Sequence, residues 1–205
     1  MKCEQEVRNL LVGNTIRLIA EGGFEKATTH AITHSGNPLS GIKMNEAYIY
    51  RLFGRKEKLY AIAFSHLDGE LVWELCRCLE SCPNLQEDTE QKLYAAFLRM
   101  WRFVIDHEEH CRCYVRYYYS VYFKDESLEA HKRLFEKIIE VFQPLFKEEA
   151  DIKSILHSVY TSIFDFAVRV FNGELKDTET NAKHIFNVIY CMMHSYFKEH
   201  ADVEP

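Results

Sequence analysis

The densest group of potentially reactive side chains lies in one short segment, where His107, His110, Cys111 and Cys113 occur within seven residues. Imidazole and thiolate groups are common metal ligands, and an accessible thiol can sense redox state. The cysteines are separated by one residue, so on a helix they point to different sides and chelate poorly. The main expectation is therefore a protein without a metal or cofactor, and a cluster that responds to a metal or to thiol redox state is the alternative.

Motifs of common catalytic sites are missing from the chain. It contains no glycine-rich loop that could hold a phosphate, no His-Glu-x-x-His pair for zinc and no nucleophile elbow. Although histidines and cysteines are numerous, no spacing among them specifies a nucleophile and its base. We therefore predict that the protein is not an enzyme.

Composition indicates an all-helical fold. Glycine and proline together number only 12 of 205 residues, too few for a many-stranded sandwich or barrel. No run of about 18 apolar residues is present, so no membrane span is expected. The chain starts with a charged segment that does not resemble a signal peptide, and its seven cysteines are an odd number. These features predict free thiols and a cytoplasmic location.

Apolar periodicity and helix-capping residues predict about nine helices that must position these side chains. The first ends near Gly22-Gly23, where glycine supplies the left-handed residue that closes a helix. The expected ranges are residues 7–22, 28–32, 46–53, 56–82, 89–104, 110–123, 127–144, 151–172 and 178–200. No segment alternates in the way that a strand requires.

Charge divides the chain into two parts. Residues 1–60 hold nine basic and six acidic side chains, a net charge of +3, whereas the remainder carries −9. A basic segment of three short helices is typical of a helix-turn-helix DNA-binding domain. The negative remainder would be repelled by DNA, so contacts with DNA are expected only in the first part.

Several short motifs in this basic segment occur in a characteristic order. They are Gly23-Phe24, Ala27-Thr28-Thr29, Ile32 and the closing run Tyr50-Arg51-Leu52-Phe53-Gly54-Arg55-Lys56-Glu57-Lys58-Leu59. By these motifs the segment resembles the TetR family of bacterial transcriptional regulators over residues 8–62. It departs from the family between Ile32 and Tyr50, where about six extra residues fall in Gly36–Gly41.

The resemblance implies how the first part would bind DNA. The third helix would present its first residues to base edges in the major groove, and flanking residues would hold phosphates. Ala47 could pack on a thymine methyl, and Glu46 could accept a hydrogen bond from cytosine. The expected DNA-binding residues are Thr29, Lys43, Glu46, Ala47, Tyr48, Tyr50 and Lys56.

The rest of the chain is expected to bind a small effector and a second copy of the protein, as the resemblance implies. Tyrosines gather in one helix, and cavity-lining positions would satisfy their hydroxyl groups, although ordinary core and surface positions would do so equally. The expected pocket residues are Trp101, Tyr114, Tyr117, Tyr118 and Phe164. The last two helices are apolar on two sides, which predicts a dimer interface of Ile155, Val159, Ile163, Ile185, Ile189, Met192 and Tyr196.

The sequence therefore predicts an all-α protein with two domains. A three-helix DNA-binding head spans residues 1–55, and a roughly six-helix effector-binding and dimerisation body spans residues 56–205. The predicted function is that of a homodimeric repressor, released from its double-stranded DNA operator by a small amphipathic or aromatic effector. A second alternative is a protein-binding adaptor whose lengthened turn has lost DNA binding.

Overall fold

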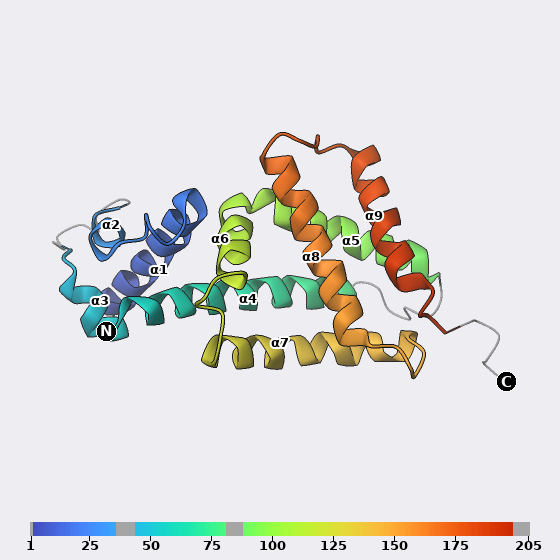
Figure 1. Cartoon of the computed structure of the whole chain (residues 1–205), viewed down its shortest axis with the longest axis horizontal. Coiled ribbons are helices and arrows are strands. Elements are labelled where there is room, and N and C mark those ends of the chain that lie inside the picture. Colours follow the sequence, from blue (N-terminus) through green and yellow to red (C-terminus); the bar gives the residue numbers. More distant parts are fainter. Residues whose placement is uncertain (1, 36–43, 81–87, 199–205) are drawn as a thin grey trace. The chain divides into compact units, whose positions relative to one another are not determined.

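The computed structural model describes residues 2–35, 44–80 and 88–198, and the regular secondary structure in these ranges is helical (Figure 1). The only β-type pairing in them is an isolated antiparallel bridge between Phe146 and Phe197. The helices are α1 (Lys2–Gly22), α2 (Thr29–His34), α3 (Ala47–Phe53), α4 (Lys56–Glu80), α5 (Thr89–Asp106), α6 (Glu108–Tyr118), α7 (Glu126–Phe142), α8 (Ile152–Phe171) and α9 (Glu179–His194), with one 3₁₀ turn at Gln143–Leu145. The predicted all-α class is confirmed.

The chain packs as two compact units. The first consists of residues 1–70 and 107–132, and the second of residues 71–106 and 133–205. Helices α4 and α7 each contribute a segment to both units. In the first unit α6 packs closely on α1, so the first N-terminal helix shares a core with a later helix. The functional boundary predicted at residue 55 stays a prediction, since packing follows a different division.

Local sequence signals set most helix ends as predicted. Helix α1 closes at Gly22, and Gly23 adopts a positive φ of 77° that a side chain would oppose. The Thr28 side chain accepts a hydrogen bond from the backbone N–H of Ala31 and so caps α2. Thr178 caps α9 in the same way through Asn181.

Helix α6 is shorter than predicted. The range 110–123 was expected to be helical, but α6 ends at Tyr118. The Ser120 hydroxyl donates to the Tyr117 carbonyl and accepts from the Tyr122 N–H, which offers the backbone a turn instead of another helical hydrogen bond. The apolar side chains that follow, including Phe123, therefore pack from a loop.

Helices α8 and α9 form an antiparallel pair in the second unit and pack on α5 (Figure 1). Gly173, with a positive φ of 76°, follows α8 and permits the chain to turn towards α9. The predicted extension of α4 to residue 82 lies outside the described residues. The predicted extension of α9 to residue 200 is wrong over residues 195–198, because α9 ends at His194 and Phe197 instead forms a bridge with Phe146. Among the helices that the structure describes, none is long and apolar enough to cross a membrane.

Candidate functional site

Helix α1 holds α2 through a buried asparagine. The Asn14 side-chain amide, 5% exposed, donates one hydrogen bond to the Ile32 carbonyl at 2.8 Å and a second to the Ser35 carbonyl. Both carbonyls belong to the C-terminal end of α2, where the helix has no backbone partners of its own. Asn14 therefore satisfies the end of α2 and fixes its direction relative to α1.

A second residue of α1 holds α3. The Arg8 guanidinium donates to the Leu52 carbonyl at 2.7 Å and lies 4.7 Å from the centre of the Phe53 ring. A cation at the C-terminal end of a helix is favoured by the helix dipole. On the other side, the buried Tyr60 hydroxyl of α4 donates to the Ala27 carbonyl at 2.6 Å. Burial raises the pKa of this tyrosine, so its hydroxyl stays a hydrogen-bond donor.

These anchors leave one side of α3 exposed. Ala47 is exposed and Tyr50 is 56% exposed. The Arg51 guanidinium lies 4.4 Å from the centre of the Tyr48 ring, so the two side chains form one cation–π pair on this surface. Apolar Ile49 and Phe53 face the core. The structure thus brings three of the predicted DNA-binding residues, Ala47, Tyr48 and Tyr50, onto one short helix.

Thr29 and Glu46 contact each other. The Thr29 hydroxyl donates a hydrogen bond to the Glu46 carboxylate, which links the first turn of α2 to the residue before α3. Both side chains are partly exposed. A phosphate oxygen would have to replace this carboxylate as the acceptor of the Thr29 hydroxyl. The predicted phosphate contact at Thr29 and the predicted base contact at Glu46 therefore compete with one another.

Two lysines at the start of α4 have different surroundings. Lys56 is partly exposed, with its ammonium 5.6 Å from the centre of the Tyr60 ring, and no acidic partner is recorded for it in the described structure. The Lys58 ammonium lies 2.6 Å from both carboxylate oxygens of Glu126, and this contact lowers the pKa of Glu126. Lys56 is therefore the better candidate for a phosphate. The predicted contact at Lys43 lies outside the described residues.

Sequence reasoning missed three residues that shape this surface. Asn14 and Arg8 contact groups 18 to 44 residues away, and no local pattern marks such contacts. Arg51 had a usable signal, because it lies three residues after Tyr48 and the two side chains must meet on a helix.

The predicted effector residues of the first unit are packed against protein groups. Tyr114 is 3% exposed and its hydroxyl lies 3.3 Å from the carboxylate of buried Asp68. The Tyr117 hydroxyl donates to the Tyr122 carbonyl and lies 2.9 Å from the Ser127 hydroxyl. These partners give the tyrosines the role of core residues. Tyr118 is partly exposed, and its ring lies 4.5 Å from that of Phe123.

The other two predicted pocket residues lie in the second unit. Trp101 is 1% exposed, and its indole N–H donates to the Asp177 carboxylate at 3.2 Å. The Arg102 guanidinium forms an ion pair with the same carboxylate, at 3.0 Å. Phe164 is 7% exposed, with its ring 6.4 Å from that of Tyr160. Neither aromatic residue lines the groove that the structure shows in this unit.

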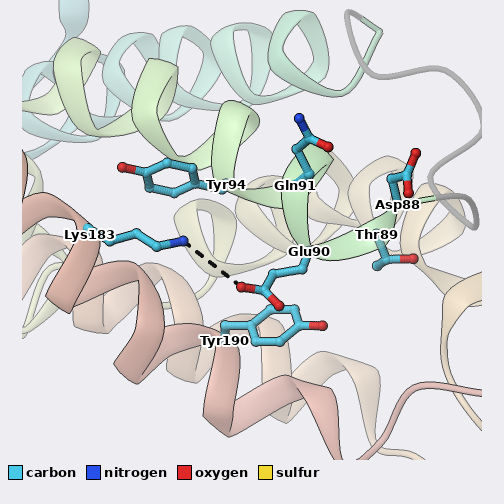
Figure 2. Close-up of a pocket in the computed structure, with 7 residues that line it drawn as sticks. All are labelled: Asp88, Thr89, Glu90, Gln91, Tyr94, Lys183 and Tyr190. Atoms are coloured by element: carbon cyan, nitrogen blue, oxygen red, sulfur yellow. Dashed lines mark ion pairs between the residues drawn. The ribbon is translucent and has the colours of Figure 1, made fainter.

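That groove lies between the start of α5 and one side of α9 and has a volume of about 470 Å³ (Figure 2). Its α5 wall is formed by residues 88–91 and Tyr94, and its α9 wall by Lys183 and Tyr190. The Lys183 ammonium lies 3.9 Å from the Glu90 carboxylate and 4.0 Å from the centre of the Tyr94 ring. The groove thus combines aromatic faces with charges of both signs, and its residues were not predicted as a site.

The histidine and cysteine cluster does not form a metal-binding geometry. Among the described residues, no three His, Cys, Asp or Glu side chains converge as metal ligands. Cys111 and Cys113 are buried, and burial raises the pKa of each thiol to about 12. His110 instead lies 3.0 Å from the Glu70 carboxylate. Burial of these two thiols disfavours the metal- or thiol-redox alternative at this cluster, because a reactive or metal-binding thiol needs access and an ionised form.

The predicted dimer residues divide into two groups. Ile163, Ile185 and Ile189 are buried within their own unit and are therefore core residues of the single chain. Ile155 and Val159 of α8 and Met192 of α9 are partly exposed, and Tyr196, in the turn after α9, is 44% exposed, so these four remain accessible. Val188, 51% exposed, adds to this outward surface of α9 and was not predicted.

Helices α1 to α3, with α3 anchored by Arg8 and exposed on one side, have the form of a helix-turn-helix motif. Solved structures share this arrangement. A TetR family transcription regulator from Marinobacter aquaeolei VT8 matches 97% of this chain and 100% of its own, with a TM-score of 0.71 and 16% identity. A TetR family regulator from Shewanella sp. PV-4 matches 94% of this chain and 98% of its own, with a TM-score of 0.71 and 10% identity. The chain therefore has the fold of the TetR family of transcription regulators.

A third solved structure, a TetR family transcriptional regulator from Vibrio parahaemolyticus, matches 94% of this chain and 99% of its own. Its TM-score is 0.65 and its identity is 14%. No protein-family model and no curated protein matches the chain by comparison. The similarity therefore lies in the fold, and these neighbours are regulators and not enzymes.

Proposed function

We propose that this protein is a DNA-binding transcription regulator whose α3 enters the major groove of double-stranded DNA. The observation that carries the proposal is the exposed surface of Ala47, Tyr48, Tyr50 and Arg51, held in place by Arg8 from α1. A recognition helix needs this combination of a rigid mount and protruding side chains that can reach base edges. The net charge of +3 in residues 1–60 supplies the attraction to phosphate.

The phosphate contact can be tested with two neighbouring lysines, before any operator is known. Binding to a random-sequence duplex should weaken as salt rises, because bound cations are released from DNA. Lys56→Met should lower the slope of log affinity against log salt by about one unit. Lys58→Met is the matched control, since its ammonium is already paired with Glu126. Equal slopes for the two variants would contradict the proposed position of DNA.

The same proposal includes a homodimer formed through the outward surface of α8 and α9. The Ser158 and Ser162 hydroxyls of α8 bond to carbonyls one turn earlier, at 2.9 and 2.7 Å. Small side chains with satisfied hydroxyls let a second helix approach closely. Partly exposed Ile155 and Val159, together with Val188 of α9, supply apolar area for a symmetric partner.

Val188→Glu tests this interface, because a carboxylate buried by a partner would be strongly unfavourable. We expect sedimentation to show a shift from dimer to monomer. Val141→Glu on α7 is the control, since Val141 is also exposed, at 44%, and lies outside the proposed surface. Unchanged sedimentation of the Val188 variant, or an equal shift for both variants, would refute the interface.

We further propose that a small effector releases this regulator from its operator in the cytoplasm, which makes it a repressor. Two heads must lie about 34–36 Å apart to reach successive major grooves. An effector that binds better to a dimer with another spacing lowers DNA affinity by its difference in binding free energy. The Tyr94 and Tyr190 side chains that line the groove between α5 and α9 support an amphipathic or aromatic effector.

A further inference from the structure

We infer that the groove between α5 and α9 is a binding site for a small organic ammonium ion with a flat apolar group. The inference goes beyond the proposed function, because it assigns a site and a ligand class that DNA binding does not require. It rests on the way in which the groove already holds an ammonium of its own chain, that of Lys183 (Figure 2).

Three groups surround the Lys183 ammonium. It lies 4.0 Å from the centre of the Tyr94 ring, 4.9 Å from that of Phe186 and 3.9 Å from the Glu90 carboxylate. Aromatic faces carry negative charge density and attract cations within about 6 Å. Two ring faces and one carboxylate therefore form a receptor for a cation, and the lysine of the neighbouring helix occupies it.

The lysine is held weakly enough to be displaced. At 3.9 Å its contact with Glu90 is too long for a hydrogen bond, and the side chains of Lys183 and Glu90 are 41% and 59% exposed. Exposed ion pairs of this kind contribute little free energy. A ligand ammonium that makes direct hydrogen bonds with Glu90 can therefore replace Lys183, whose flexible side chain can extend into water.

The lining favours a cation over an anion. The lining residues include two carboxylates, Asp88 and Glu90, and one ammonium, that of Lys183, so the groove carries a net negative charge. The Tyr190 ring lies nearly parallel to Phe186, 5.6 Å between centres, and offers a flat surface to an apolar group. The hydroxyls of Tyr94 and Tyr190 have no hydrogen-bond partner in the described part of the chain, and they can bond to a ligand. Burial, and to a lesser extent the nearby Glu90 charge, raises the pKa of Tyr190, so its hydroxyl stays protonated and can donate a hydrogen bond.

Three probes that share one ring but differ in charge test the inference. Benzylammonium is a cation, benzyl alcohol is neutral and benzoate is an anion at pH 7.5. Each is titrated into the full chain without DNA, with affinity measured by calorimetry and location by backbone amide chemical shifts. We expect benzylammonium to bind about threefold or more tightly than benzyl alcohol, with benzoate weakest, and shifts confined to residues 88–94 and 183–190.

Substitutions then separate a cation receptor from an anion receptor. Lys183→Ala removes the internal competitor, so it should tighten benzylammonium binding about threefold or more. Glu90→Gln should weaken that binding by a similar factor. Tyr94→Leu, which keeps an apolar side chain without the π face, should also weaken it. Lys153→Ala, an exposed lysine of α8, is the control and should change nothing.

Three results would overturn the inference. The first is that benzylammonium binds saturably to neither the wild type nor Lys183→Ala. The second is that benzoate binds more tightly than benzylammonium and that Lys183→Ala abolishes this binding. The third is that benzylammonium changes the chemical shifts of residues outside the groove. Lys183 and Glu90 are exposed enough for their variants to fold even if the Tyr94 variant does not. Because no DNA is present, failure here leaves the DNA-binding proposal standing, and failure of DNA binding leaves this inference standing.

Discussion

Replacement of Asn14 by alanine should destabilise the protein far more than an ordinary substitution on a helix. The side chain is 5% exposed and donates to the carbonyls of Ile32 and Ser35. The first contact is fully buried, and a buried polar group left without a partner costs about 1–3 kcal/mol. The second is partly buried, so water can replace some of it. We expect a total loss of about 2–4 kcal/mol.

The assay is denaturant unfolding followed by circular dichroism, with Asn9→Ala as the matched control. Asn9 lies on the same helix but is exposed, and it only accepts a hydrogen bond from Gln5. Its replacement should change the free energy of unfolding by less than about 0.5 kcal/mol. Equal stabilities of the two variants would refute the reasoning, since they would show that Asn14 does not hold α2 in place.

Two further predictions concern buried hydroxyl and thiol groups. With pKa values of about 12, Cys111 and Cys113 should be ionised in roughly one molecule in ten thousand at pH 8. Iodoacetamide should therefore modify exposed Cys191 first, and Cys111 and Cys113 only after the protein unfolds. Mass spectrometry of native and denatured samples checks this order. Early modification of either buried thiol would contradict their burial. Tyr60→Phe removes the hydrogen bond to the Ala27 carbonyl and should cost about 1–2 kcal/mol in thermal unfolding. A cost near zero would mean that water replaces this contact.

Features set by neighbouring residues could be predicted from the sequence. The caps at Thr28 and Thr178 and the helix end at Gly23 follow from side chains within three residues of the backbone groups concerned. The exposure of Ala47 and Tyr50 beside buried Ile49 follows from helical periodicity in the same way.

Features that depend on packing between distant segments could not be predicted. Tyr114 became a core residue because it meets Asp68, 46 residues away, which no local pattern reveals. Ile185 and Ile189 lie on an apolar face that the sequence could not assign to either a partner or the chain's own core. The groove beside Lys183 was missed because its two walls are about ninety residues apart.

The contact between Thr29 and Glu46 has a similar origin and bears on DNA recognition. Each residue was predicted separately as a contact to DNA, and only the structure shows that the hydroxyl of one donates to the other. A duplex must therefore either displace Glu46 from Thr29 or accept both side chains as a pair. If Glu46 turned to contact a base, the Thr29 hydroxyl would be free to donate a hydrogen bond to a phosphate oxygen.

The central claim is that α3 reads a specific DNA sequence, and selection of DNA fragments by the purified protein tests it most directly. Sequencing of fragments retained from a genomic or random library should yield a palindromic consensus with half-sites about one helical turn, or a multiple of it, apart. Tyr50→Ala, which alters the exposed surface of α3, should lose the enrichment. Failure of the wild-type protein to enrich any sequence, under salt conditions in which it binds duplex DNA, would contradict the account.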